Sequence, residues 1–387
     1  MMMPTQSAGA GRFADFDLYR VPSPCFVIDE VKLSENLGIL KTLGMAANAN
    51  ILLALKAFSM WELAPLISKY LDGCCASGLW EAKLAQNRFG GHVSTYSPAF
   101  KPNEIDEIAT LSSHVIVNTP QQAVRFGAQI AAGNAELGLR VNPMHSEGEV
   151  AKYDPCAPGS RLGTPLRQLE NKLPEAVQGL HIHTLCEQGF PPLARTVDAL
   201  HPFLEAVAQQ LRWLNLGGGH LVTHHDYERA ALAELINALA HRYDMRVFLE
   251  LGTAVAFDAG ILVGEVLDLL DNEGPVAVLD VSATCHMPDV LEAPYRPALR
   301  DERAGGQAVR LGGPSCLAGD VIGTYGFDAL PQAGDRLAFL DQAHYSMVKT
   351  TTFNGVPLPA LAIWNSDTDA VRMVRAFGYA DFEGRLS

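Results

Sequence analysis

Eight short apolar runs constrain the fold of this chain more than any other feature of its sequence. They lie at residues 51–57, 71–77, 92–97, 114–118, 137–142, 180–185, 213–217 and 247–252. Most are apolar on both faces, which is typical of parallel strands that helices cover. Amphipathic helical patterns separate them, for example at 61–70, 79–89, 120–132, 194–210 and 227–241. Eight strand–helix units fill roughly 250 residues, so we predict a (β/α)8 TIM-type barrel over residues 44–260.

The sequence changes character after Gly252. Runs typical of strands follow at 261–269, 275–281, 336–340 and 371–377, broken by glycine and proline. They predict a second, all-β domain over residues 261–387. A further strand is expected at 23–29, after a loose N-terminal tail and before a helix at 30–43. We expect this whole segment, residues 1–43, to pack with the β domain. The long loop 143–165 is either a lid or a sign of misassignment.

Composition narrows the function classes. With 387 residues, 48% hydrophobic and 19% charged, the chain suits a soluble globular enzyme. The net charge of −14 argues against a nucleic-acid or membrane partner and favours a cationic substrate, although many proteins are acidic for solubility alone. The seven cysteines form no C-x-x-C pair, and no long apolar stretch indicates a leader or a membrane span. We therefore expect a cytoplasmic protein.

Glycines follow the seventh and eighth apolar runs, as Gly217, Gly218 and Gly219 and as Gly252 before Thr253. The active site of a barrel lies at the C-terminal ends of its strands, and the loops after strands seven and eight commonly hold phosphate. Backbone N–H groups of glycines can approach an anion closely. A triple glycine taken alone is more often a tight turn, but this position favours a phosphate site.

Lys56 is the one charged residue in the stretch 51–58. Apolar neighbours disfavour the charged form of a lysine and leave an amine able to form a Schiff base. The alternative is a lysine whose amine reaches from the strand end to water. Together with a phosphate site across the barrel, Lys56 predicts pyridoxal phosphate, because that cofactor needs both ends of its molecule held.

Two more side chains are expected at the same barrel mouth. Glu250 ends the eighth run, where a buried carboxylate needs a cationic partner such as a protonated pyridine nitrogen. An ion pair with Arg140 is the alternative. His183 is a candidate to stack on the cofactor ring, whereas we expect His181 to be a core residue.

Several stretches match a known family in order along nearly the whole chain. They read LALKA at 53–57, PCAPGSRLG at 155–163, GLHIH at 179–183, DVSAT at 280–284 and GPSCLAGD at 313–320. On these stretches the chain resembles the fold type III pyridoxal-phosphate decarboxylases of the alanine-racemase-like barrel class, and within them the carboxynorspermidine decarboxylases.

The resemblance implies roles for individual residues. Lys56 would form the Schiff base, His183 would stack on the ring, and Glu250 would face the pyridine nitrogen. Cys316 would enter the site from a partner subunit and protonate the product, which implies a homodimer with shared sites. The remaining cofactor-binding candidates are Ser77, Arg140, Gly217, Gly218, Gly219, Gly252, Thr253 and Tyr345. As substrate-binding residues we predict Glu187, Asp289, Arg296 and Asp320, of which the acids, with Glu292, would neutralise the substrate's ammonium groups. We predict no metal ion.

The chain also departs from related decarboxylases. Glu250, Leu251, Gly252 and Thr253 stand where Glu-Pro-Gly-Arg is usual, so one cationic contact is absent. Thr184 replaces an expected asparagine, and Leu317 follows Cys316 where diaminopimelate decarboxylases have an acid, which favours the carboxynorspermidine branch.

The predicted reaction is decarboxylation of carboxynorspermidine or carboxyspermidine to norspermidine or spermidine, two substrates that the sequence does not rank. The alternatives are a diaminopimelate, ornithine or arginine decarboxylase, an amino-acid racemase, a lysine aldolase without pyridoxal phosphate, and a non-catalytic regulator.

Overall fold

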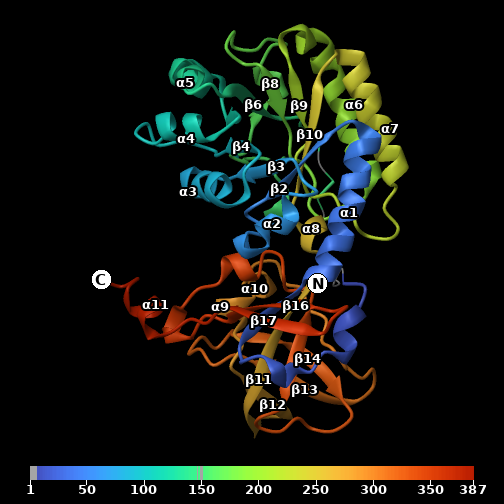
Figure 1. Ribbon diagram of the computed structural model, residues 1–387, viewed down its shortest axis with the longest axis vertical. Coiled ribbons are helices and arrows are strands. Elements are labelled where there is room, and N and C mark those ends of the chain that lie inside the picture. Colours follow the sequence, from blue (N-terminus) through green and yellow to red (C-terminus); the bar gives the residue numbers. More distant parts are fainter. Residues whose placement is uncertain (1–6, 146, 149–150) are drawn as a thin grey trace. The chain divides into compact units, whose positions relative to one another are not determined.

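The computed structural model describes residues 7–145, 147–148 and 151–387. The chain divides into two compact units, one from Glu35 to Val255 and one formed by residues up to Ser34 together with Ala256–Ser387. The first is called the barrel unit below and the second the sheet unit. Figure 1 shows the elements of both. None of the helices in the described residues is long and apolar enough to cross a membrane.

The barrel unit is a closed parallel barrel of eight strands. Their order is β5-β4-β3-β2-β10-β9-β8-β6, and β5 pairs with β6 to close the ring. The strands are β2 Asn50–Ala54, β3 Gly73–Ala76, β4 His92–Tyr96, β5 His114–Val117, β6 Glu136–Asn142, β8 Gly179–His181, β9 Trp213–Asn215 and β10 Arg246–Leu251. Each of the eight apolar runs overlaps one of them, so the predicted (β/α)8 barrel is confirmed.

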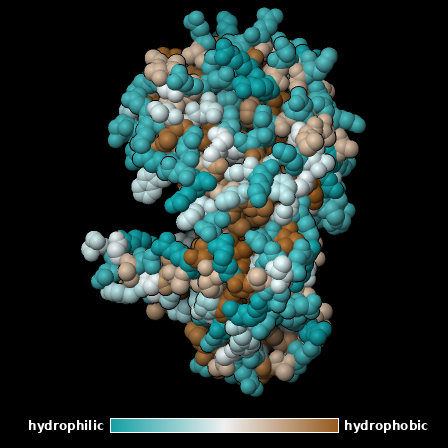
Figure 2. Space-filling view, viewed as in Figure 1, coloured by the Kyte–Doolittle hydropathy of each residue, from teal (hydrophilic) through white to brown (hydrophobic). Residues whose placement is uncertain are grey.

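Helices cover the outside of the strands in Figure 1. They are α1 Glu30–Ala47, which begins in the sheet unit, α2 Ala64–Ile67, α3 Leu79–Leu84, α4 Ile105–Leu111, α5 Pro120–Ala132, α6 Phe190–Val207 and α7 Arg229–Tyr243. The short helix α8 Thr253–Ala256 follows the C-terminal end of β10. In α5, the Thr119 side chain accepts a hydrogen bond from the Gln122 amide at 3.2 Å, and Pro120 occupies the first turn. The surface over these helices is largely hydrophilic on the face shown in Figure 2, as expected of helices that bury one side.

Aromatic packing fills the barrel at the N-terminal ends of its strands. Trp213 is fully buried, and its ring stacks on His114 with centroids 4.0 Å apart. A Cβ atom on Gly138 or Gly179 would lie 2.3 or 1.9 Å from that indole, so these two strands need glycine there. The barrel is therefore filled by side chains at the N-terminal ends of its strands. An active site can form only at the C-terminal ends.

Among its described residues the sheet unit has eight strands, in the order β14-β13-β12-β11-β1-β16-β17, with β15 paired to β11. They are β1 Cys25–Asp29, β11 Gly260–Asp271, β12 Pro275–Leu279, β13 Gln307–Gly312, β14 Val321–Phe327, β15 Arg336–Leu340, β16 Ala360–Asn365 and β17 Ala370–Arg375. Three short helices also belong to it, α9 Ala283–His286, α10 Asp289–Glu292 and α11 Tyr379–Glu383.

The N-terminal strand β1 lies inside this sheet, antiparallel to β11 and parallel to β16. Its Phe26 packs in one core cluster, while its neighbours Cys25 and Val27 pack in another. Successive side chains of a strand point to opposite faces, so β1 is buried on both. The prediction that the β domain takes the N-terminal strand is confirmed.

In the predicted loop 143–165 the structure describes a short helical turn, Ala151–Tyr153, and a strand, β7 Thr164–Pro165, which pairs with β6. Residues 146, 149 and 150 of this loop lie outside the described residues.

Candidate active site

The barrel unit gathers the predicted cofactor residues at the C-terminal ends of four strands. Lys56 follows β2, His183 follows β8, Gly217 to Gly219 follow β9, and Glu250 lies near the end of β10. The charge of Lys56 helps to lower the pKa of both His183 and Glu250, so the three groups act on one another. Lys56 is exposed although Leu55 and Ala57 are buried, so its apolar neighbours do not take its amine out of solvent.

Glu250 is a buried carboxylate held by two donors. Its Oε1 accepts a hydrogen bond from Asn215 Nδ2 at 2.8 Å, and its Oε2 lies 3.2 Å from His181 Nε2. Burial alone would raise the pKa of Glu250, but the bonds from His181 and Asn215 and the charge of Lys56 outweigh it and lower the pKa. Burial lowers the pKa of His181. At neutral pH the pair is therefore an ionised Glu250 and a neutral His181 that donates from Nε2.

Arg140, the alternative partner of Glu250, binds elsewhere. Its Nη2 donates to the backbone oxygen of His183 at 3.2 Å, and its guanidinium lies 4.6 Å from the centre of the Tyr96 ring. Arg140 is only 5% exposed, and no carboxylate among the described residues forms an ion pair with it. A buried cation without an acid suits an anionic group of a bound molecule.

The glycine turn after β9 packs against its neighbours. A Cβ atom on Gly217 would lie 2.3 Å from the oxygen of Ile182, and one on Gly218 would lie 2.0 Å from the oxygen of Glu250. The amide of Gly217 donates to Asn215 Oδ1, and that of Gly218 donates to His183 Nδ1. Among the described residues the Gly219 amide has no acceptor, so of the three glycine amides it is the one best able to bind phosphate.

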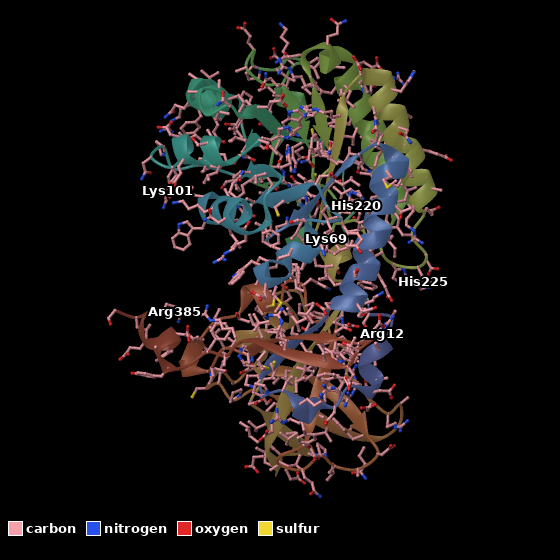
Figure 3. The ribbon with its side chains drawn as sticks, in the orientation of Figure 1. Arg12, Lys69, Lys101, His220, His225 and Arg385 are labelled. Atoms are coloured by element: carbon pink, nitrogen blue, oxygen red, sulfur yellow. The ribbon has the colours of Figure 1, made fainter. Side chains whose placement is uncertain are left out.

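His183 is a neutral imidazole with a defined tautomer. Burial, followed by the charges of Lys56 and Arg140, lowers its pKa well below the ordinary value. Because Nδ1 accepts from Gly218 at 3.1 Å, the ring proton is on Nε2. His220, labelled in Figure 3, follows the glycine turn. Its Nδ1 lies 3.3 Å from the hydroxyl oxygen of Tyr227.

His181, His183 and Glu250 also place three possible metal-ligand atoms within 4.8 Å of one another. The hydrogen bonds favour another use of them. A neutral imidazole binds a metal through a nitrogen without a proton, whereas His183 uses its free nitrogen for Gly218 and His181 turns its N–H toward Glu250. These hydrogen bonds occupy His183 Nδ1 and His181 Nε2.

Three other predicted positions lie at the same barrel end. Thr253, at the start of α8, donates to Glu187 Oε1 at 3.1 Å. Ser77 follows β3 and is exposed, and its amide donates to Glu81. Gly252 accepts a turn hydrogen bond from Val255. Glu187 is half-buried, and Thr253 is its only hydrogen-bond partner among the described residues.

The other predicted residues belong to the sheet unit. Asp320 is buried, and its carboxylate accepts from Ser315 Oγ at 2.6 Å, from Ser282 Oγ at 2.8 Å and from the amide of Thr284. It therefore joins the loop that carries Cys316 to the segment before α9. Cys316 itself is exposed, and its amide donates to Asn354 Oδ1.

Asp289, Arg296 and Tyr345 also have defined surroundings there. Lys349 Nζ donates to Asp289 at 2.6 Å and to Glu292 at 2.7 Å. Arg296 forms an ion pair with Glu302 and lies over the Tyr325 ring. Tyr345 has a positive φ of 51°. The three predicted acids of this unit, Asp289, Glu292 and Asp320, thus already have partners within the protein.

Comparison with known proteins identifies the family. Residues 25–343 match the family described as pyridoxal-dependent decarboxylase, C-terminal sheet domain. The chain belongs to this family. It is 41% identical to the carboxyaminopropylagmatine decarboxylase of Synechocystis sp., over 95% of this chain and 96% of that protein. It is 37% identical to the carboxynorspermidine/carboxyspermidine decarboxylase of Campylobacter jejuni, over 95% and 99% of the two chains.

Solved structures give the same result. The crystal structure of carboxynorspermidine decarboxylase from Campylobacter jejuni, complexed with norspermidine, superimposes with a TM-score of 0.87 at 36% identity, over 94% of this chain and all of the other. A diaminopimelate decarboxylase from Helicobacter pylori superimposes with a TM-score of 0.80 at 17% identity and shares the fold. The family resemblance and the expected pyridoxal-dependent decarboxylase class are confirmed.

Asn215 and the role of His181 are absent from the sequence prediction. The position of each residue in the sequence gives a sign of its role. His181 stands two residues before His183, and strand residues two apart point to the same side. Asn215 stands two residues before Gly217, at the end of the strand that delivers the glycine turn.

Proposed function

We propose that this protein decarboxylates an α-amino acid carried at the end of a polyamine chain, with carboxynorspermidine or carboxyspermidine as substrate and norspermidine or spermidine as product. The observation that carries the proposal is the buried, ionised Glu250 at the barrel end where Lys56, His183 and the glycine turn meet. The relatives named for these substrates support the choice of substrate.

The residues of the barrel mouth fit pyridoxal phosphate. When bound, this cofactor supplies an aldehyde for the substrate amine and a ring that accepts the electron pair left by carbon dioxide. Glu250 would hold a proton on the pyridine nitrogen, and His183 would lie flat on the ring without adding a charge. The Gly219 amide, with Gly252 and Thr253, would bind the phosphate. Arg140 would bind an anionic oxygen of the cofactor or substrate.

Lys56 would bind the cofactor aldehyde before the substrate and take its place again after product release. Ser77 and Tyr345 remain proposed cofactor contacts. One carbon–carbon bond breaks, carbon dioxide leaves, and one proton is added to the carbon that carried it. We assign this proton to Cys316 of a second copy of the chain, on the family resemblance and on the exposure of this thiol. The protein would then be a homodimer. None of its seven cysteines, all of which lie in the described part of the chain, forms a disulfide, which suits our expectation of a cytoplasmic enzyme.

Glu187 is the acid best placed in the barrel unit to bind an ammonium group of the substrate. An arginine at position 253 would pair with it, whereas Thr253 gives it one hydrogen bond and no opposing charge. Asp289, Arg296 and Asp320 stay proposed substrate contacts, although each already has a partner in the sheet unit.

A second candidate substrate is carboxyaminopropylagmatine, because the relative at 41% identity is named for it. It ends in a guanidinium where the other candidates end in an ammonium group. Both classes place the same amino acid at the reacting end, so the barrel site described above serves either.

Carbon dioxide release from purified protein tests the proposal. The substrate panel is carboxynorspermidine, carboxyspermidine, carboxyaminopropylagmatine, diaminopimelate, ornithine and arginine. We expect the highest kcat/KM for one of the first three. Faster release from diaminopimelate, ornithine or arginine would refute the proposal, and a protein that releases none from any of them would be a non-catalytic relative.

A further inference from the structure

Asn215 closes a ring of three hydrogen bonds between the glycine turn and Glu250. Its Oδ1 accepts from the Gly217 amide at 2.8 Å, and its Nδ2 donates to Glu250 Oε1 at 2.8 Å. The amide of Glu250 donates to the Gly217 oxygen at 2.8 Å. One side chain at the end of β9 thus fixes the backbone of the turn and the carboxylate of β10 together.

The amide side chain of Asn215 makes both of these contacts at once. Asparagine offers an acceptor and a donor at once, whereas aspartate offers acceptors alone. An aspartate at this position would put a second negative charge 2.8 Å from Glu250. Asn215 is fully buried, so no water can replace a lost bond without a change of structure, and a buried group left without its partner costs free energy.

Asn215 differs in this respect from His181, the other donor to Glu250. His181 holds Oε2 alone, and its second ring nitrogen is buried without a partner among the described residues. Asn215 holds Oε1 and the turn simultaneously. The orientation of the carboxylate and the position of the Gly217–Gly219 amides therefore depend on the same side chain.

We propose that Asn215 is a positioning residue, which aligns Glu250 with the pyridine nitrogen and the glycine turn with the phosphate of one bound cofactor. The inference rests on the proposed function for the nature of the ligand. The three hydrogen bonds on which it depends lie entirely within the barrel unit.

Binding of a cofactor analogue to the apoprotein tests this role without turnover. 4′-Deoxypyridoxine 5′-phosphate keeps the ring nitrogen and the phosphate but lacks the aldehyde, so its affinity does not require Lys56 chemistry. Asn215→Ala removes two hydrogen bonds and should weaken its binding on the order of tenfold to a hundredfold. Ser112→Ala is the matched control. It also removes a buried hydrogen bond, to Thr95 at 2.8 Å, but it precedes β5 and should leave the affinity unchanged.

A double-mutant cycle separates positioning from general destabilisation. If Asn215 acts through Glu250, then Glu250→Gln should cost clearly less affinity in the Asn215→Ala protein than in the parent. Additive losses, or an unchanged affinity in Asn215→Ala, would overturn the inference.

Asn215→Asp tests the two contacts one at a time. This variant keeps the acceptor for Gly217 and loses the donor to Glu250. Exchange of the Gly217 amide hydrogen in the apoprotein should be fast in Asn215→Ala and close to the parent rate in Asn215→Asp, while both bind the analogue weakly. Equal exchange in all three proteins would contradict the proposed contact with the turn. If the parent binds the analogue but decarboxylates no substrate, the proposed function fails and the positioning role stands.

Discussion

The backbone amide of Gly218 donates a hydrogen bond to Nδ1 of His183 at 3.1 Å. This contact joins the glycine turn after β9 to the imidazole after β8 and sets the ring tautomer. The residue proposed to stack on the cofactor ring is thus held by the turn proposed to approach the phosphate.

Substitutions at His183 should separate this hydrogen bond from the flat ring. His183→Phe keeps an aromatic surface but loses the acceptor for Gly218, and His183→Ala loses both. One lost hydrogen bond corresponds to about tenfold in affinity, so we expect about tenfold weaker binding of pyridoxal phosphate to apo His183→Phe and a larger loss in His183→Ala. Fluorescence titration measures both. Equal losses would show that the ring surface contributes nothing.

Lys56→Ala should abolish carbon dioxide release, because it removes the amine proposed to bind the cofactor aldehyde. In the parent protein, borohydride reduction should attach the cofactor to the peptide that contains Lys56, as mass spectrometry would show. Lys69→Ala is the control, since Lys69 is an exposed lysine of the same unit, labelled in Figure 3. A Lys56→Ala protein with parental activity would exclude pyridoxal-phosphate catalysis through this residue.

Glu187→Gln should raise KM for the polyamine substrate about tenfold, because a charge-assisted hydrogen bond is lost, and should leave the affinity for pyridoxal phosphate unchanged. Thr253→Arg should raise KM similarly, since it would neutralise Glu187. The two changes combined should add little to either one. Steady-state kinetics on the single and double variants would check this, and a loss of cofactor affinity in Glu187→Gln would assign the acid to the cofactor instead.

The proposed homodimer with shared sites can be tested by mixing inactive variants. Lys56→Ala lacks the amine and Cys316→Ala lacks the proton donor. If each site combines Lys56 of one subunit with Cys316 of its partner, an equal mixture of reassembled subunits should regain about one quarter of the parental sites. No recovery, in a mixture shown to contain heterodimers, would mean that both residues of a site come from one chain.

The barrel was predictable because its strands are buried on both faces and read as continuous apolar runs. In the sheet unit, β11, β12, β15 and β17 coincide with predicted runs, but β13, β14 and β16 do not. β13 alternates buried Val309 and Leu311 with exposed residues, and β14 contains two glycines. Short strands with one solvated face or with glycines carry a weak apolar signal, so the sequence pattern missed β13 and β14.

Some residues of the candidate site could be predicted from the sequence and others could not. Lys56, His183 and Glu250 were predictable because each is an unusual residue at the end of an apolar run. The roles of His181 and Asn215 were not predictable. A polar residue in a strand cannot be told from an ordinary buried core residue until its hydrogen-bond partner on another strand is known, which here is Glu250. The interpretation of Asp320 as a substrate acid has the same weakness, since its partners Ser282 and Thr284 are more than thirty positions away along the chain.

The final prediction concerns stability and depends on two histidines at the N-terminal ends of β4 and β5, the half-buried His92 and the buried His114. The rings of His92 and His114 lie 4.3 Å apart, and each is within 4.9 Å of Phe248. Burial lowers the pKa of His92 from 6.5 to about 3 and also lowers that of His114. Below about pH 6.5 these histidines therefore bind protons in the unfolded chain but not in the folded barrel. As a result, the free energy of unfolding falls as the pH drops, by up to about 1.4 kcal/mol per pH unit for each histidine.

Urea unfolding between pH 7 and pH 5 follows this proton uptake, to which His181 and His183, whose pKa burial also lowers, contribute as well. The carboxyl of Glu136, whose pKa is lowered to about 2 chiefly by its bond with His114, stays ionised over that interval when folded. The parent protein should lose stability steadily across the interval. His92→Phe keeps an aromatic ring against Phe248 and should lose stability with a shallower slope. The comparison uses the slope, since the substitution also changes packing at every pH. An identical slope in both proteins would show that His92 is not held neutral in the folded barrel.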